Sequence, residues 1–308
     1  MDAAPDARLG TEAALRADQI DRLSAPRPDI CHMSMDRPRI MGILNVTPDS
    51  FSDGGQHFAL SDAVARAMAM AVDVDILDIG GESTRPGARE VPAAEEIART
   101  APVIRALRRA GLTTPISIDT RKAAVAAAAL DAGADMVNDV TALRFDPDMA
   151  ALVADRAVPI CLMHSVADPE TMQDHADYRD VLSEVYDHLA ERMDVAEAAG
   201  IDRARMIVDP GIGFGKTEDH NIKLLQGLGL LHALGVPVLL GASRKRFIGS
   251  IGGAEAADDR MPGSLAVALH GAAQGIHILR VHDTAETRQA LLLWEALAGN
   301  EGQNENGT

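Results

Sequence analysis

The sequence is poor in aromatic residues and in cysteine, and each shortage narrows what the chain can be. Aromatic residues make up 3% of the 308 residues. Aliphatic side chains must therefore fill the core, as they do in a parallel sheet covered by helices. The two cysteines, Cys31 and Cys161, allow neither a disulfide framework nor a CxxC metal site. Cys161 lies in an apolar run, so we expect it in the core.

Positive charge and long apolar runs are also scarce. Lysine and arginine number 29 against 46 aspartates and glutamates, which gives a formal net charge of −17. A nonspecific nucleic-acid surface needs a positive potential, so we expect no nucleic-acid partner. No run of about 18 apolar residues occurs, so we expect no membrane span. Residues 1–10 lack a basic segment followed by an apolar one, so we expect no signal peptide and a cytoplasmic location.

The two ends of the chain differ in composition from its middle. Residues 1–36 combine several prolines with mixed charges, which predicts an N-terminal extension with a short helix over 11–23. Residues 299–308 are polar and rich in glycine and asparagine, which predicts a disordered tail. The remaining residues, 37–298, approach the length of about 250 residues that is typical of an eight-fold barrel.

Within this middle part, short apolar runs alternate with helical patterns eight times. Strands are expected at 39–46, 76–79, 116–118, 136–137, 159–163, 206–208, 236–240 and 276–281. The rhythm predicts an α/β fold, a parallel sheet closed into a single-domain (β/α)₈ TIM barrel. The main rival is an open doubly wound sheet, which usually has a glycine-rich turn after its first strand. The first strand here is followed instead by Asn45-Val46-Thr47-Pro48-Asp49-Ser50.

Two helix ends carry distinct local signals. Asp283 is followed three residues later by Glu286, which predicts a capping box at the start of the last helix. Residues 72–75, before the second strand, lack the glycine that commonly ends a helix. We therefore expect a weak helix end there.

Residues just past the strands of such a barrel face one shared mouth. A long polar loop, 45–55, follows the first strand and is either a surface turn or a lid. Asn45 at the strand tip offers an amide oxygen to a hard cation such as Mg²⁺. Residues 80–87 follow the second strand and form either a glycine-rich turn or an anion cradle containing Thr84 and Arg85.

The middle strands end in carboxylates and an amide. Asp119 either caps the following helix or serves the site. Asn138 is either a polar strand end or an amide that recognises the edge of a heterocycle. Residues 209–217 resemble a phosphate loop, but Pro210 stands where that loop needs its first glycine, so we reject this interpretation. Asp209 remains as a carboxylate at the mouth.

The late strands bring positive charge. Residues 241–246 contain three consecutive cations before a helix expected at 247–251, which favours an anion site over a solvated basic patch in such an acidic chain. Arg280 and His282 point the same way in a strand of period two and suit an oxyanion or phosphate. His164 after the fifth strand is expected to be structural. Together these residues suit a polar heterocycle beside an anionic leaving group.

Several of these strings occur, in the same order, in one enzyme family. The sequence resembles the dihydropteroate synthases in residues 41–55, 80–87, 118–122, 137–140, 209–217, 243–245 and 280–283. The resemblance covers roughly residues 37 to 297. It implies a barrel, usually a homodimer, that uses Mg²⁺ and joins 6-hydroxymethyl-7,8-dihydropterin diphosphate to 4-aminobenzoate. The products are 7,8-dihydropteroate and pyrophosphate, in folate biosynthesis.

The resemblance also implies roles for individual residues. The pterin would be held by Asp119, Asn138, Asp209 and Lys245. The diphosphate would be held by Arg280 and His282, and by Asn45 through Mg²⁺. The 4-aminobenzoate would lie between Phe214 and Lys245, with Ser243 in support, under the loop of Thr84 and Arg85. Catalysis would rest on Asp119, Lys245, Arg280 and His282, since the departing diphosphate and the pterin cation both need stabilising charges.

Departures from the family pattern and two alternatives remain. Arg246 stands where several family members carry serine near the aminobenzoate carboxylate, and residues 165–169 and 73–74 also differ. A pterin-binding methyltransferase would share Asp119, Asn138 and Asp209, but it would not need the late anion site. A pterin-binding paralogue without synthase activity is the non-enzymatic alternative, and the intact loops argue against it.

Overall fold

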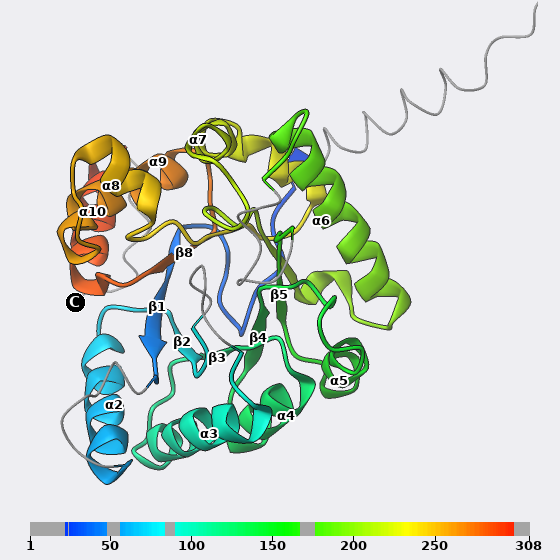
Figure 1. Ribbon diagram of the computed structural model, residues 1–308, viewed down its shortest axis with the longest axis vertical. Helices are drawn as coiled ribbons and strands as arrows, with labels where there is room; N and C mark the ends of the chain where they lie inside the picture. The colour runs from blue at the N-terminus through cyan, green and yellow to red at the C-terminus, as the bar shows by residue number, and fades with distance from the viewer. Residues whose placement is uncertain (1–21, 24, 48–55, 84–89, 167–175, 299–308) are drawn as a thin grey trace, which may run out of the picture.

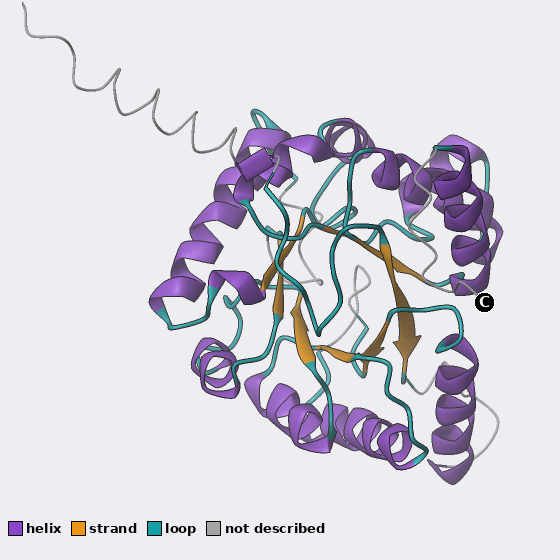
Figure 2. Ribbon diagram, turned by 180° about the vertical axis from the view of Figure 1, so that it is seen from behind, coloured by secondary structure: helices purple, strands orange, loops and turns teal. Residues whose placement is uncertain are grey.

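The barrel predicted from the sequence is confirmed. The computed structural model describes residues 22–298 except 24, 48–55, 84–89 and 167–175. Within them, a ring of parallel strands is surrounded by helices (Figures 1 and 2). The strand order is β6-β5-β4-β3-β2-β1-β8-β7. A parallel bridge between Val208 and Val238 joins the two edges, so the sheet is nearly closed.

The elements follow the expected alternation. The strands are β1 Arg39–Asn45, β2 Ile76–Gly80, β3 Ile116–Asp119, β4 Met136–Asp139, β5 Ile160–Met163, β6 Met206–Asp209, β7 Leu239–Leu240 and β8 Ile278–Val281. The helices are α2 Gln56–Met70, α3 Ala93–Arg109, α4 Ala123–Ala132, α5 Met149–Arg156, α6 Val181–Ala198, α7 Glu218–Gln226, α8 Arg246–Gly252, α9 Met261–Ala273 and α10 Thr284–Leu297. Strand β7 is shorter than the predicted 236–240, because Pro237 has no N–H for the ladder. None of the described helices is both long and apolar enough to span a membrane.

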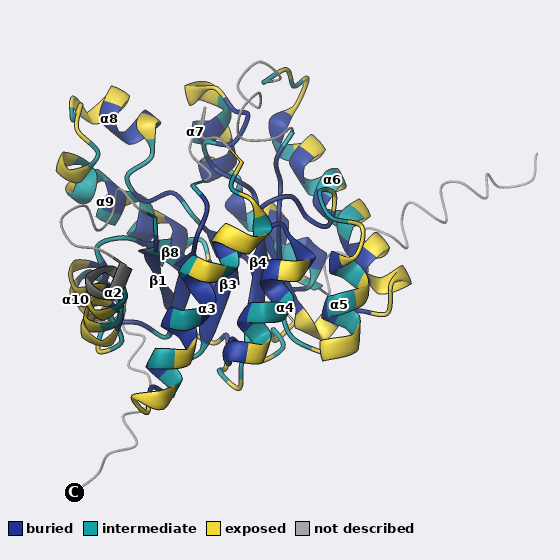
Figure 3. Cartoon of the chain, turned by 60° about the horizontal axis from the view of Figure 1, so that its bottom comes forward, coloured by how far each residue is buried: buried dark blue, intermediate teal, exposed yellow. Residues whose placement is uncertain are grey.

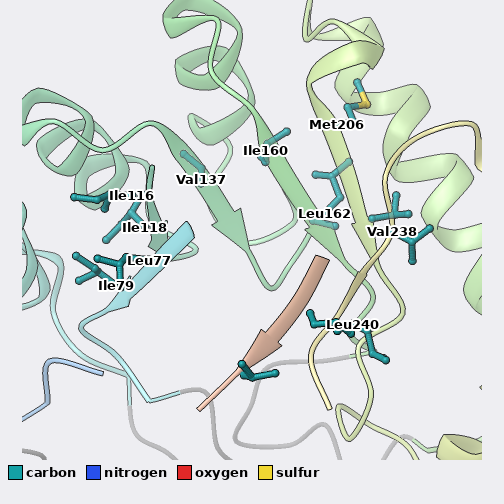
Figure 4. Packing of buried hydrophobic residues seen from close by; sticks show 14 of the residues in the cluster. Leu77, Ile79, Ile116, Ile118, Val137, Ile160, Leu162, Met206, Val238 and Leu240 are labelled. Atoms are coloured by element: carbon teal, nitrogen blue, oxygen red, sulfur yellow. The ribbon is translucent and has the colours of Figure 1, made fainter. Parts of the chain in front are cut away.

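The period of two in the strands divides the residues between two environments. Outward-facing aliphatic side chains, such as Leu77, Ile79, Ile116 and Ile118, pack in the main core cluster with helix residues (Figure 4). The strands are buried, while the outer helix surfaces are exposed (Figure 3). Inward-facing residues begin with an apolar layer at the amino ends of the strands, formed by Met41, Ile76, Met136, Cys161, Ile207, Leu239 and Ile278. The expectation that Cys161 is a core residue is confirmed.

This apolar layer is closed from below by part of the expected N-terminal extension. Ile30 and Met35 are buried against it. The backbones of Ile30 and Met33 exchange two hydrogen bonds of 3.0 and 2.9 Å, which form a tight turn. The division into extension, barrel and tail stays a prediction. The tail and most of the helix expected over 11–23 lie outside the described residues.

Two local predictions about helix ends are wrong, for tertiary reasons. Asp283 precedes α10, but its side chain makes no capping hydrogen bond, because the guanidinium of Arg244 binds both of its carboxylate oxygens at 3.1 and 2.5 Å. The end of α2 without glycine is tied down rather than weak. Arg288 donates to the Asp73 carbonyl at 3.1 Å and to the Asp75 carboxylate at 2.6 Å.

Candidate active site

A salt-bridge network fills the barrel interior above the apolar layer. Arg280 on β8 donates through Nε to Oδ2 of Asp78 at 2.6 Å and through Nη2 to Oδ2 of Asp119 at 2.6 Å. Asp78 lies on β2 and is completely buried. Asp119 is the last residue of β3, and Lys122 occupies the N-cap position of α4. The capping interpretation of Asp119 is therefore wrong, and its carboxylate belongs to the site.

Asp78 was missed by the sequence reasoning. It lies two residues after the inward-facing Ile76, so the strand period points it into the barrel. Its Oδ2 also accepts from Nδ2 of Asn138 at 3.3 Å, which joins the predicted amide on β4 to the predicted cation on β8. The signal in the sequence was a carboxylate within an apolar strand run. Such a group is rarely buried unless it is paired.

Asn45 lies on the other side of Asp119. The parallel register pairs Asn45 with Gly80 and Gly80 with Asp119. A Cβ atom on Gly80 would lie 3.4 Å from Cβ of Asp119 and 3.8 Å from Oδ1 of Asn45. The absence of a side chain at Gly80 thus keeps the space between amide and carboxylate open.

Asp209, at the end of β6, completes a set of three buried carboxylates. Its Oδ1 accepts from the backbone N–H of Gly211 at 2.7 Å. Its Oδ2 lies 3.4 Å from where a Cβ atom on Gly241 would be, and Cδ of Arg280 lies 3.9 Å from the same point. Asp209 and Arg280 therefore approach each other over Gly241.

Two of these carboxylates, Asp119 and Asp209, have raised pKa values. Burial raises the pKa of Asp119 to about 7, with Asp78 adding to the rise and Arg280 opposing it. Burial raises the pKa of Asp209 to about 6, against the Gly211 N–H and the charge of Arg280. Burial alone would lower the pKa of Arg280, but Asp78 and Asp119 outweigh it and raise the pKa above its usual value. Arg280 thus stays charged while Asp119 and Asp209 titrate closer to neutrality than an ordinary aspartate.

The predicted anion residues form a second group above Arg280. The ring nitrogen Nδ1 of His282 lies 3.0 Å from Oγ of Ser243, which also accepts from the His282 backbone N–H at 3.2 Å. Arg244 adopts a φ of 58° and is clamped by Asp283 and Asp258. Of the three consecutive cations, Arg244 is therefore committed to the protein, and its clamp fixes the turn between Ser243 and Lys245.

Phe214 and Lys245 are in direct contact, whereas the family resemblance places 4-aminobenzoate between them. The ammonium of Lys245 lies 3.9 Å from the ring centroid of Phe214, which is a cation–π contact. Phe214 belongs to the loop after β6, and Lys245 occupies the N-cap position of α8. The segments that follow β6 and β7 thus form this contact together. Thr84 and Arg85 lie outside the described residues.

The arrangement has a clear chemical logic. The hydrogen-bond acceptors and the amide come from β2, β3, β4 and β6, while Arg280, Lys245 and His282 come from β8 and from the segments that follow β7 and β8. Arg280 uses two of its five N–H donors on carboxylates, so others remain for an anion. Among the described residues, no group of three or more histidine, cysteine, aspartate or glutamate side chains could hold a metal ion.

Comparisons with known proteins agree with this geometry. Residues 41–282 match the model of the pterin binding enzyme family. A dihydropteroate synthase from Synechocystis sp. is 44% identical over 91% of this chain and 99% of that protein. A solved Xanthomonas albilineans dihydropteroate synthase with 4-aminobenzoic acid is 49% identical, with a TM-score of 0.83 over 89% of this chain and 99% of that one.

A longer relative is also similar. A probable bifunctional folylpolyglutamate synthase/dihydropteroate synthase from Haloferax volcanii is 47% identical over 92% of this chain. The chain spans about a third (34%) of the length of that relative. The match of the family model, the full-length relatives and the shared barrel show that the chain belongs to the dihydropteroate synthase family of pterin-binding enzymes.

Proposed function

We propose that this protein condenses 6-hydroxymethyl-7,8-dihydropterin diphosphate with 4-aminobenzoate to give 7,8-dihydropteroate and pyrophosphate. One observation carries the proposal: Arg280 binds the buried carboxylates Asp78 and Asp119, and two residues later on the chain His282 contacts Ser243. A substrate with a heterocycle at one end and a diphosphate at the other matches this division of charge. The Synechocystis relative, 99% of which is covered by this chain, is named dihydropteroate synthase.

The pterin would bind on the carboxylate side. Asp209 and Asn138 are buried acceptors and donors that suit the N–H groups and oxygen of the ring. Asp119 would face the carbon that becomes electron-poor when the diphosphate leaves. An ionised carboxylate in a low-dielectric site stabilises such a developing cation strongly.

The diphosphate would bind on the cation side. Arg280 and His282 would donate to its oxygens, while Lys245 would contact the pterin. The C–O bond breaks with its electron pair going to pyrophosphate. The amine nitrogen of 4-aminobenzoate forms the new C–N bond and then loses a proton to solvent. An arylamine attacking a resonance-stabilised cation needs no strong base.

The 4-aminobenzoate would stack beside Phe214, with Lys245 and Ser243 close to it. Thr84 and Arg85 would lie on a loop that closes over this substrate, and the loop after Asn45 would cover the mouth. These two loops remain predictions from the sequence. Their task would be to exclude water, which would otherwise trap the cation.

Mg²⁺ is the cofactor that the family resemblance implies. Asn45 Oδ1, beside the Gly80 gap, is a hard oxygen ligand of the kind that Mg²⁺ accepts. Because Mg²⁺ usually takes few protein ligands and fills its sphere with water and substrate phosphates, this donor set fits. When bound, the ion would neutralise charge on the departing diphosphate.

An assay for pyrophosphate release separates the alternatives. The purified protein would receive pterin diphosphate, 4-aminobenzoate and Mg²⁺, with parallel reactions lacking one component each. The synthase releases pyrophosphate only when both substrates are present. A methyltransferase or a silent pterin-binding paralogue releases none, and that result would exclude the proposed function.

A homodimer is proposed as well. The outer face of α10 exposes Leu292, Leu293 and Leu297 (57, 62 and 80%), and such a contiguous apolar helix face supports burial against a second copy. Light scattering after size exclusion should give twice the chain mass. Leu293→Lys with Leu297→Lys should shift it to the mass of one chain. The cytoplasmic location and the absence of nucleic-acid and membrane partners remain predictions from the sequence.

A further inference from the structure

Lys216 is buried in the loop between β6 and α7, the segment whose glycines suggested a phosphate loop. Its side chain is turned into the protein, and the residue is 4% exposed. The ammonium donates to the carbonyl oxygens of Gly211 at 2.9 Å and of Phe214 at 3.0 Å, and lies 2.9 Å from Nδ1 of His164. Three acceptors match the three N–H bonds of an ammonium group. Lys216 therefore binds its own loop rather than a ligand.

His164, which directly follows β5, supplies the third acceptor. Burial, and then the charge of Lys216, lower the pKa of His164 to about 2, so the ring is neutral and Nδ1 can accept. The backbone of His164 is equally engaged. Its N–H donates to the Asp209 carbonyl at 2.9 Å, and its carbonyl oxygen lies 1.9 Å from where a Cβ atom on Gly211 would be. Strand β5 and the loop after β6 are thus locked together around one ammonium group.

The carbonyls that Lys216 binds lie next to two substrate contacts. Gly211 donates its N–H to the Asp209 carboxylate at 2.7 Å. Phe214 presents its ring to the Lys245 ammonium from the same loop. Movement of either carbonyl would therefore turn the carboxylate proposed for the pterin or the ring proposed for 4-aminobenzoate.

We propose that Lys216 is a positioning residue for both substrates, whose ammonium holds residues 210–217 in the shape that orients Asp209 and Phe214. It does not touch either substrate. The inference rests on the proposed function for the identity of the substrates. The position of the Lys216 ammonium follows from its contacts with His164, Gly211 and Phe214 alone.

Lys216→Met tests the proposal, because methionine keeps most of the volume and removes the donors. Hydrogen exchange should become faster in peptides covering 210–217 and stay unchanged in α3 and α4. The KM for 4-aminobenzoate should rise by about tenfold or more, as expected when hydrogen bonds to a charged group are lost. Lys223→Met, an exposed lysine on the adjacent α7, is the matched control and should change neither quantity.

The outcomes separate the possibilities. Wild-type exchange and KM in Lys216→Met would overturn the proposal. So would faster exchange throughout the protein with an unchanged KM, which would indicate a purely structural role. If Lys216→Met does not fold, His164→Leu removes one acceptor and should give the same local changes, and wild-type behaviour there would overturn the proposal. If the unmodified protein releases no pyrophosphate, the proposed function fails, while the exchange experiment still decides what Lys216 does.

Discussion

Replacing Arg280 with alanine should lower both the free energy of unfolding of the protein and its kcat. The substitution leaves Asp78 and Asp119 buried without their cation. Removing one partner of a buried pair costs about 3 to 5 kcal/mol. The lower end applies, because the Arg280 side chain is 19% exposed and water can partly replace it. Loss of a preorganised donor should also lower kcat by about 10²- to 10³-fold.

The stability deficit of Arg280→Ala should depend on pH in a definite direction. Burial raises the pKa of Asp119 to about 7 although Arg280 opposes the rise, so without Arg280 the Asp119 carboxylate holds its proton more tightly in the folded state. The folded variant then binds more protons than the folded wild type, and its stability deficit shrinks as the pH falls from 8 to 6. Denaturant unfolding at both pH values and pyrophosphate release measure the two effects. Arg105→Ala, exposed on α3, should change neither.

Two results would refute the role assigned to Arg280. Near-normal turnover in Arg280→Ala would exclude it from stabilising the diphosphate. An equal stability deficit at pH 8 and pH 6 would show that the buried carboxylates do not depend on it. The turnover and stability of Arg280→Lys should lie between those of Arg280→Ala and the wild type. Lysine keeps the charge but loses the planar fork that reaches both carboxylates.

Three further substitutions probe other parts of the site. Asp78→Asn should lower kcat/KM about tenfold and move the acid limb of the pH–rate profile to lower pH, because Asp78 raises the pKa of Asp119; an unmoved limb would contradict this coupling. Phe214→Leu should raise the KM for 4-aminobenzoate roughly fivefold to thirtyfold by removing the ring under Lys245, with the pterin KM unchanged as its control. Gly211→Ala should lower the melting temperature by more than about 5 °C, since its φ is 65° and the new methyl group would lie 1.9 Å from a backbone oxygen; an unchanged melting temperature in calorimetry would rule out this close packing.

The barrel itself could be predicted because its rules are local. Alternation of apolar runs with helical patterns needs only neighbouring residues, and parallel strands place the residues that follow them at one end. For that reason Asp119, Asn138, Asp209 and Arg280 could be assigned to one mouth before their contacts were known. Two of the predicted strands were too short, because Asp119 and Asp209 lie within β3 and β6 rather than after them.

The features that escaped the sequence depend on distant partners. Asp78 is flanked by Leu77 and Ile79, and its role becomes visible only with Arg280, 202 residues away. Asp283 has the spacing of a helix cap, but Arg244, 39 residues away, takes its carboxylate. A local sequence pattern indicates which contacts a side chain can make. Charged residues that are distant in the sequence determine which of these contacts form.

The inward turn of Lys216 could not be predicted either. The sequence excluded a phosphate loop because Pro210 interrupts the pattern, but it left the direction of the lysine open. That direction depends on His164, 52 residues earlier in the chain, and on a carbonyl that Gly211 can offer only from a φ of 65°. The roles of Thr84 and Arg85 remain predictions from the sequence.

The central claim is that one mouth binds the pterin and the diphosphate on opposite sides of Arg280 and passes the pterin to an arylamine. Measuring both products in the same reaction, by chromatography for dihydropteroate and a coupled assay for pyrophosphate, tests it most directly. We expect equal amounts of the two products, formed only when both substrates are present, and loss of both in Arg280→Ala. Pyrophosphate without dihydropteroate, or neither product from the folded wild-type protein, would contradict the claim.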